Sequence, residues 1–274
     1  MVAPPVLMPV RATVWDRLRT EAAAVAQSEP GLASLLHAVI LGHDNLACAL
    51  SFQIARKLGD AELGAMTLRE IAQEAYRQKP ALVAAAEADL EAVYQRDAAT
   101  HGFVQPFLFF KGFLALQAHR VAHHLWTGGR TTLALYLQSR VSELLAVDIH
   151  PAARFGQGVF LDHGTGIVVG ETAVVGDNVS MLQGVTLGGT GKENGDRHPK
   201  IGEGVLLSAH ATVLGNIEVG AYAKIAAGSV VLKPVPPHCT AAGVPARLVN
   251  CPTGDCPAES MDQSLSEAAF DYVI

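Results

Sequence analysis

The sequence predicts an α + β-solenoid protein, in which an all-helical N-terminal domain precedes a parallel β-helix of hexapeptide repeats. Three observations point to this fold class. Apolar residues recur every three or four positions over residues 13–145, as they do on one face of a helix. After about residue 147 the spacing of aliphatic residues changes to six. A glycine directly follows several of these aliphatic residues, where a tight backbone corner would need it.

The helical half is divided by short segments that end helices. Gly and Pro residues in SEPG, KLGDAELG, RQKP and TGGR separate stretches such as MTLREIAQEAYRQ and ALVAAAEADLEAVYQRD. These stretches are rich in Ala and Leu and poor in strand formers. We therefore predict a helical domain over residues 1–146.

The repeat half keeps its period over many positions. Ile149, Phe155 and Leu161 have the spacing but are offset by two residues from those that follow. Short strands stacked in coils explain a period of six, because their aliphatic side chains pile into one continuous interior. We predict a β-helix over residues 147–250 and a flexible tail over 251–274. The aliphatic positions after the offset are Val169, Val175, Met181, Leu187, Ile201, Leu207, Val213, Val219, Ile225 and Val231.

One polar stretch interrupts the repeat. Residues 187–202 read LGGTGKENGDRHPKIG, and the period of six fails inside them. The outer face of a regular coil offers only flat, short side chains. A projecting loop at this point could instead close a pocket over a small polar molecule.

Composition narrows the classes of function. The chain has 274 residues, half of them apolar, and a net charge of −6, which favours a globular protein and argues against nucleic acid as its main partner. Neither a membrane-spanning run nor the pattern of a signal peptide is visible, so we expect a cytoplasmic protein. The four cysteines are too few and scattered for a disulfide framework. Cys251 and Cys256 could bind metal or form a bridge, but a mobile tail is the favoured interpretation.

Several motifs together resemble the serine acetyltransferase family of hexapeptide-repeat acyltransferases. They are LDHGTGIVVGETAVVG, GGTGKENGDRHPKIG, HGFVQPFLFFKGFLALQAHR and PVPPHCTAAGVPAR, and the resemblance runs from about Val14 to Arg247. It implies a left-handed coil, trimers with active sites between neighbouring prisms, and a dimer of trimers joined through the helical domains. It also implies transfer of acetyl from acetyl-CoA to L-serine, the first step of cysteine synthesis, with no tightly bound cofactor and no metal.

The chemistry of serine acetylation identifies candidate catalytic residues. A serine hydroxyl needs a base near neutral pH, and a histidine held by a carboxylate suits this role. His163 matches the family's base and Asp148 its orienting partner. The two are fifteen residues apart, close to the roughly eighteen residues of three hexapeptides, so we expect them to be stacked neighbours.

The two substrates suggest the remaining site residues. The resemblance assigns Asp97 and Asp162 to the ammonium of serine, and Arg197 and His198 to its carboxylate across a subunit boundary. For acetyl-CoA it needs small residues that let the pantetheine arm approach the backbone. In SAHATVLG the chain departs from the family's Gly-rich segment through Ser208 and His210. The expected acetyl-CoA residues are Gly189, Thr190, Ala209, Ala227 and Gly228.

Further expectations concern regulation and partners. By family analogy, L-cysteine should inhibit in the serine pocket, and the terminal Ile274 should insert into O-acetylserine sulfhydrylase. Three alternatives stay open at this point. They are an acetyltransferase for a sugar or another hydroxyl acceptor, a zinc enzyme of the γ-carbonic-anhydrase type, and a non-catalytic scaffold that holds the sulfhydrylase.

Overall fold

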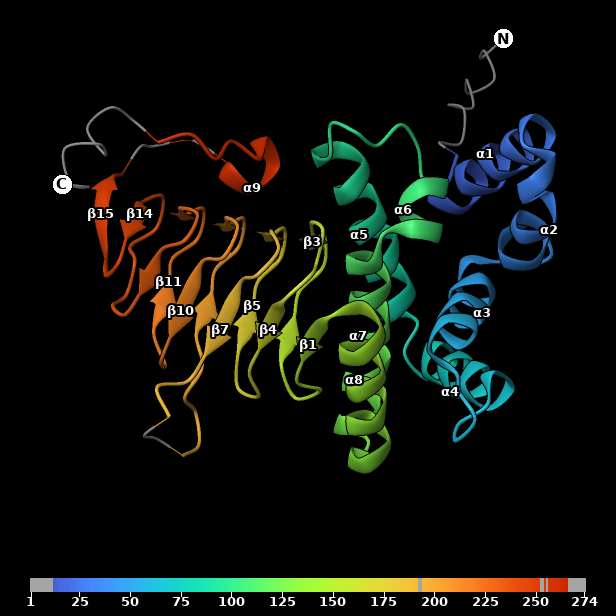
Figure 1. Cartoon of the computed structure of the whole chain (residues 1–274), viewed down its shortest axis with the longest axis horizontal. Coiled ribbons are helices and arrows are strands. Elements are labelled where there is room, and N and C mark those ends of the chain that lie inside the picture. Colours follow the sequence, from blue (N-terminus) through green and yellow to red (C-terminus); the bar gives the residue numbers. More distant parts are fainter. Residues whose placement is uncertain (1–11, 192–193, 252–253, 255, 266–274) are drawn as a thin grey trace, which may run out of the picture.

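The computed structural model describes residues 12–191, 194–251, 254 and 256–265. Figure 1 shows a helical half and a β-helix arranged end to end along the long axis of the molecule. The last long helix ends at Leu145 and the first strand begins at Val147, so the architecture changes within one residue. Among the described residues, no helix is both long and apolar enough to cross a membrane.

The helical half packs around α7. This helix buries most of its side chains between its neighbours, including Phe113, Leu116 and Val121. The helices are α1 (Val14–Ser28), α2 (Ala33–Leu36), α3 (Leu46–Leu58), α4 (Ala65–Gln78), α5 (Ala81–Arg96), α6 (Val104–Phe109), α7 (Lys111–Thr127) and α8 (Thr131–Leu145), with short 3-10 and π segments at Pro30–Leu32 and His37–Leu41.

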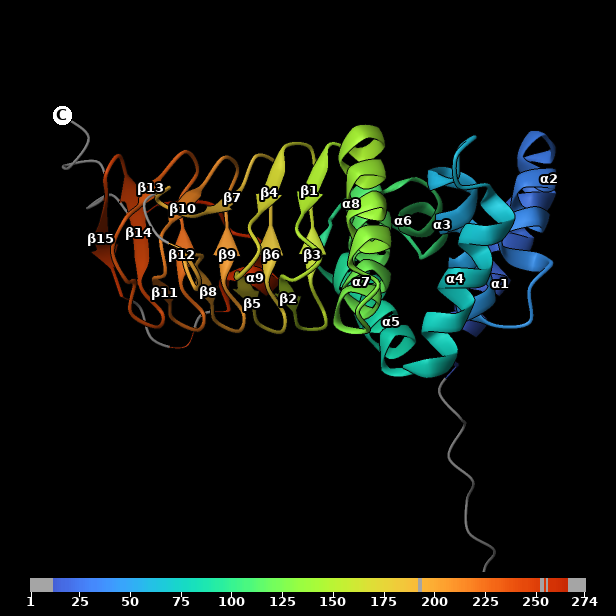
Figure 2. The same ribbon diagram turned by 90° about the horizontal axis from the view of Figure 1, so that it is seen from below.

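The β-helix has three sheets, which we name A, B and C. Sheet A has the order β1-β4-β7-β10-β13, sheet B the order β11-β8-β5-β2, and sheet C the order β15-β14-β12-β9-β6-β3. All pairs are parallel except β14 with β15, and Figure 2 shows the strands stacked coil upon coil. The strands are β1 (Val147–Ile149), β2 (Arg154–Phe155), β3 (Phe160–Leu161), β4 (Ile167–Val169), β5 (Val174–Val175), β6 (Ser180–Met181), β7 (Thr186–Gly188), β8 (Lys200–Ile201), β9 (Leu206–Leu207), β10 (Thr212–Leu214), β11 (Glu218–Val219), β12 (Lys224–Ile225), β13 (Val230–Val231), β14 (Thr240–Gly243) and β15 (Ala246–Asn250).

The predicted aliphatic column forms the interior of the β-helix. Val169 pairs with Leu187, and Leu187 pairs with Val213, so each lies directly on the next. All three are buried. The predicted helical domain followed by a parallel β-helix is therefore confirmed, and its core is the stack of residues that sets the period of six.

The cysteines differ from our expectation. Cys239 and Cys251 form a disulfide, while Cys48 and Cys256 are free. The cause is the hairpin of β14 and β15, in which Thr240 pairs with Asn250. That pairing places the residues just outside it side by side, although they are twelve positions apart in the sequence.

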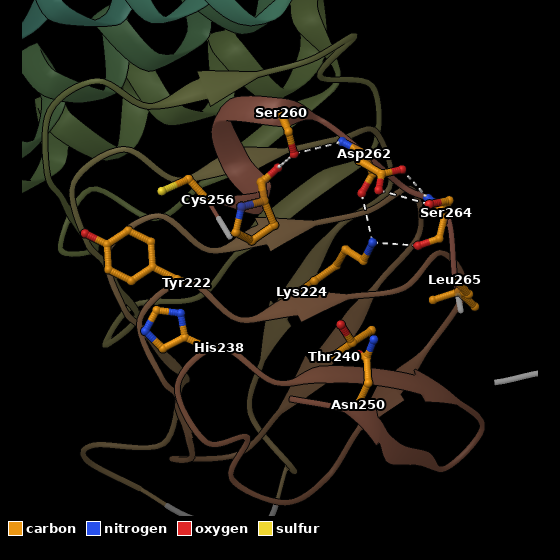
Figure 3. A pocket seen from close by; sticks show the side chains of 11 residues that line it. Tyr222, Lys224, His238, Thr240, Asn250, Cys256, Ser260, Asp262, Ser264 and Leu265 are labelled. Carbon is orange, nitrogen blue, oxygen red and sulfur yellow. Dashed lines mark hydrogen bonds between the residues drawn. The ribbon is translucent and has the colours of Figure 1, made fainter. Parts of the chain in front are cut away.

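Residues 256–265, where we expected part of a flexible tail, pack against the β-helix. Helix α9 (Pro257–Ser260) lies over sheet C, where the buried Ser180 hydroxyl donates to the Ala258 carbonyl (2.8 Å). Figure 3 shows Lys224 donating to the backbone of Asp262 (3.0 Å) and Ser264 (2.6 Å) beside a cavity of about 470 Å³. Ile274 lies outside the described residues.

Candidate functional site

The candidate residues lie mainly at two corners that border sheet A. The first, the C–A corner, joins sheet C to sheet A through residues 162–166, 182–185, 208–211 and 226–229. The second, the A–B corner, joins sheet A to sheet B and includes the loop between β7 and β8. Both corners interrupt the repeat. Leu161 and Val169 are two residues further apart than one hexapeptide, and the 187–202 loop breaks the period altogether.

His163 projects from the enlarged first turn of the C–A corner. Its backbone has a left-handed conformation (φ 57°), and Gly164 after it does too. The side chain of His163 is 70% exposed, and its Nε2 lies 3.7 Å from an oxygen of Asp162. The two extra residues of this turn thus place an imidazole outside the coil, beside a carboxylate.

Helix α7 packs very close to this turn. A Cβ on Gly112 would clash with the carbonyl of Leu161, and one on Gly164 would lie 3.2 Å from the Cα of Gly112. Two glycines therefore permit the approach. At the same place the amino group of Lys111 donates to the hydroxyl of Thr165.

Asp97 and Asp162 face the same cavity as His163. The cavity has a volume of about 460 Å³ and is also lined by Phe109, Phe110 and Lys111. Asp97 lies where α5 ends and accepts hydrogen bonds from the Thr100 hydroxyl and the Ala99 amide (2.8 Å each). The helical half therefore supplies one wall of the pocket, as the prediction for Asp97 requires.

Two carboxylates in one cavity favour a cationic ligand. Burial raises the pKa of Asp162, the neighbouring His163 opposes that effect, and the negative charge of Asp97 adds to it. A bound ammonium group would relieve this repulsion and return the Asp162 pKa toward its usual range. The cavity therefore suits the amine end of an amino acid.

Asp148 is not stacked beside His163, which corrects our expectation. It lies in the middle of β1, in register with Val168, and its carboxylate accepts a hydrogen bond from Gln138 (2.6 Å). Within one chain, no ion pair within 4.0 Å joins it to His163. The fifteen-residue spacing does not stack the two residues because the first coil advances twenty residues, from Asp148 to Val168, and the two extra residues lie in the His163 turn.

The A–B corner holds Arg197 and His198 on a compact framework around Thr172. The Thr172 hydroxyl accepts hydrogen bonds from the backbone amides of Arg197 (3.0 Å) and His198 (3.1 Å). The Arg197 guanidinium pairs with Glu171 (2.8 Å). The His198 ring covers Gly170, where a Cβ would lie 2.8 Å from ring atom Cε1 and closer still to two others.

The environment of His198 fixes its protonation state. Burial lowers the pKa of His198, and the charge of Arg197 lowers it further. The backbone amide of Thr172 donates to Nδ1 (3.1 Å), so the proton of the neutral ring is on Nε2. His198 is therefore a neutral hydrogen-bond donor near pH 7.

The residues expected at acetyl-CoA divide between the same two corners. Ala209, Ala227 and Gly228 lie in the C–A corner on the coils beyond His163, and the amide of Gly228 donates to the carbonyl of Ala209 (2.8 Å). Gly189 and Thr190 begin the A–B loop. They lie on the side of sheet A that carries Arg197, whose Cγ would lie 3.5 Å from a Cβ on Gly189.

Sheet A separates the two groups of residues. Asp148 is the one charged residue in the five strands of this sheet, and Val168 exposes 41% of its surface there. The strands of sheet B, in contrast, carry Arg154, Lys200 and Glu218. A single chain thus keeps the two halves of the site on opposite edges of a weakly charged face.

Some residues at the site lie within the quoted motifs but were not expected to line it. Lys111, Phe109 and Phe110 reach the cavity because α6 ends and α7 begins against the first coil. Glu171 and Thr172 were quoted within a motif, yet their support of the loop depends on contacts 25 and 26 residues away. In the described part of the chain, no three His, Cys, Asp or Glu residues gather as a metal site would need.

Comparison with protein families matches both halves. The family model described as the N-terminal region of serine acetyltransferase matches residues 14–118, and that for bacterial transferase hexapeptide repeats matches residues 198–233. A relative from Salmonella typhimurium, a serine acetyltransferase, is 57% identical over 261 residues. That match covers 94% of this chain and 96% of the relative.

Solved structures show the same fold. A serine acetyltransferase in complex with cysteine superposes with a TM-score of 0.91 at 53% identity, covering 92% of this chain and 98% of the other. The Brucella abortus enzyme in complex with coenzyme A gives 0.85 at 51% identity, covering 87% and 97%. The Neisseria gonorrhoeae enzyme in complex with serine gives 0.84 at 52% identity, covering 86% and 97%.

Proposed function

Because the chain belongs to the serine acetyltransferase family, we propose that it transfers the acetyl group of acetyl-CoA to the hydroxyl of L-serine. The products are O-acetylserine and CoA, in the pathway to cysteine. The observation that carries this proposal is the cavity that joins His163, a candidate base, to the carboxylates of Asp97 and Asp162. A sugar acceptor is not favoured, since a neutral sugar has no ammonium group for those carboxylates to bind.

The complete site forms between two protomers. His163 lies at one edge of sheet A and Arg197 and His198 at the other, so a neighbouring chain must present its A–B corner to the C–A corner of the first. Contact between two different edges is heterologous, and such contacts close into a ring when the rotation from one protomer to the next completes a full turn. The weakly charged outer face of sheet A supports a trimer with this face at its centre.

Serine binds as a zwitterion across this boundary. Its ammonium group lies between Asp97 and Asp162 of one protomer. Its carboxylate accepts hydrogen bonds from Arg197 and from Nε2 of His198 in the neighbour. Both ends are then held by charged or polar groups, and the hydroxyl is directed toward His163.

The reaction is a direct transfer. His163 takes the hydroxyl proton as the serine oxygen attacks the thioester carbon, and the proton passes on to the departing CoA sulfur. Asp148 lies on the exposed face of sheet A, so we assign the orienting carboxylate to the neighbouring protomer rather than to the same chain. Acetyl-CoA runs along the C–A corner past Ala209, Ala227 and Gly228, with Gly189 and Thr190 of the neighbour on the other side.

Regulation and partners follow from the same pocket and from the chain end. Cysteine differs from serine by one atom, so it competes for the serine position. A relative with cysteine bound supports this inference. Ile274 stays a predicted contact with O-acetylserine sulfhydrylase, to be checked by capture of that enzyme with and without Ile274. A cytoplasmic location and a dimer of trimers also stay predictions.

An assay of free thiol released from acetyl-CoA tests the function. Serine should be the best acceptor among serine, threonine, homoserine and a galactoside. His163→Ala should nearly abolish release while the oligomer stays intact, and His37→Ala, an exposed histidine in the helical half, should leave it unchanged. Faster release with the galactoside, or wild-type rates for His163→Ala, would reject the proposal.

A further inference from the structure

His210 occupies a backbone position that is glycine on every neighbouring coil. Hydrogen bonds along the C–A corner run from the Gly184 amide to the Thr165 carbonyl, from His210 to Gln183, and from Gly228 to Ala209 (2.8 Å each). This register aligns His210 with Gly166, Gly184 and Gly228. All four have left-handed backbones, with φ of 59° at His210 and 68–78° at the glycines.

The left-handed backbone at position 210 favours glycine over histidine. This conformation costs a residue with a Cβ about 1 kcal/mol or more, and glycine avoids that cost. The three aligned coils show that the corner itself is satisfied by glycine. The side chain of His210 is thus not required by the corner, and it lies in the corner already assigned to acetyl-CoA.

The imidazole of His210 lies toward the end of the C–A corner that carries His163. A Cβ on Gly184 would meet this ring, at 2.6 Å from Cε1, whereas a Cβ on Gly228 would meet nothing within 4 Å. The ring thus covers the preceding coil at Gly184 and leaves the following coil open at Gly228. Coils are about 4.8 Å apart, so the ring lies about one coil from the turn that carries His163.

Several polar side-chain atoms around His210 have no protein partners. Within the described residues, neither ring nitrogen of His210 makes a hydrogen bond, and its side chain is exposed. The buried Gln183 Oε1 and Ser208 Oγ are also without partners there. Because buried polar atoms are normally paired, these groups point to a ligand with hydrogen-bonding groups of its own.

We propose that His210 binds the pantetheine arm of acetyl-CoA, donating a hydrogen bond from its ring to an amide carbonyl while its face packs against the cysteamine carbons. This proposal rests on the function proposed above. A thioester attacked beside His163 leaves its sulfur near the first turn. The two methylenes and the first amide of the arm then extend along the corner by about one coil, which is the level of the ring.

The substitution His210→Gly separates binding from folding. Glycine suits the left-handed position, so the variant should be at least as resistant to heat as the wild type. Its KM for acetyl-CoA should rise about tenfold, equivalent to about 1.4 kcal/mol, while the KM for serine stays within twofold. The same penalty should appear with acetyl-pantetheine, which lacks the nucleotide.

His238→Gly is the matched control. His238 is also a histidine with a left-handed backbone (φ 60°), but it lies at the corner between sheets B and C, where its ring stacks on Tyr222. Its replacement should leave both KM values unchanged. An unchanged KM for acetyl-CoA in His210→Gly, or a penalty that disappears with acetyl-pantetheine, would overturn the assignment to the pantetheine arm.

The outcome is distinguishable from failure of the proposed function. If the wild type released no CoA with serine, that function would be wrong, and the contact would be tested by calorimetric titration of CoA alone. Weaker CoA binding by His210→Gly than by His238→Gly would then support the contact. Equal binding by the two variants would reject it.

Discussion

Replacement of Asp89 by asparagine should destabilise the protein strongly. Asp89 lies on α5 with none of its surface exposed. Its carboxylate accepts hydrogen bonds from Arg120 (2.8 Å), Gln117 (2.9 Å) and the backbone amide of Val159 (2.9 Å). Arg120 also donates to the carbonyl of Gly156 (2.7 Å). One buried charge thus connects α5, α7 and the first coil of the β-helix.

The magnitude follows from what the substitution leaves behind. Burial raises the pKa of Asp89, and the charge of Arg120 opposes that effect. Asparagine keeps the size but removes the charge, and its NH₂ group can accept nothing from the surrounding donors. Removing one partner of a buried ion pair costs about 3–5 kcal/mol. We expect a loss of that size in Asp89→Asn.

Urea unfolding at fixed protein concentration measures this loss, because the stability of an oligomer depends on concentration. Glu91→Gln is the control on the same helix. Glu91 pairs with Arg17 at 3.9 Å, and both side chains are 36% exposed, so its loss should be within about 1 kcal/mol of zero. A change below about 1 kcal/mol for Asp89→Asn would refute the reasoning.

Three further predictions concern protonation and serine binding. Burial holds the pKa of His119 well below its usual range, so only the unfolded state takes up its proton below about pH 6.5. Through this residue, the free energy of unfolding of the wild type should fall on acidification by up to about 1.4 kcal/mol per pH unit. The fall should be smaller in His119→Phe, and urea titrations at several pH values measure both. Asp162→Asn should raise the serine KM about tenfold or more in steady-state assays, by loss of a charged partner. Gly170→Ala should displace the His198 ring and raise the serine KM, with little effect on that for acetyl-CoA.

The sequence predicted the fold because the relevant packing repeats. Each interior residue, such as Leu187 between Val169 and Val213, meets its equivalents one coil away. A regular period therefore reports the contact directly. The interruptions are equally informative. The offset after Leu161 is the two-residue enlargement that projects His163, and the failed period after Leu187 is the loop that holds Arg197.

Contacts that do not recur from coil to coil could not be predicted from the sequence. The register of Asp148 depends on the length of the first coil, and the Cys239–Cys251 disulfide depends on the pairing of β14 with β15. Lys111 reaches the cavity because α7 begins in close contact with the first turn. None of these depends on a local pattern, so periodicity could not indicate them.

Mixed oligomers test the shared site most directly. His163→Ala and Arg197→Ala damage opposite corners, and each variant alone should be nearly inactive at low serine. When the two chains are co-expressed with different tags and purified through both, every trimer contains both chains, and an intact His163 corner meets an intact Arg197 corner at one of its three boundaries, or about one third of the sites. We predict recovery of about that fraction of wild-type activity, and recovery no higher than either variant alone would contradict a site built from two chains.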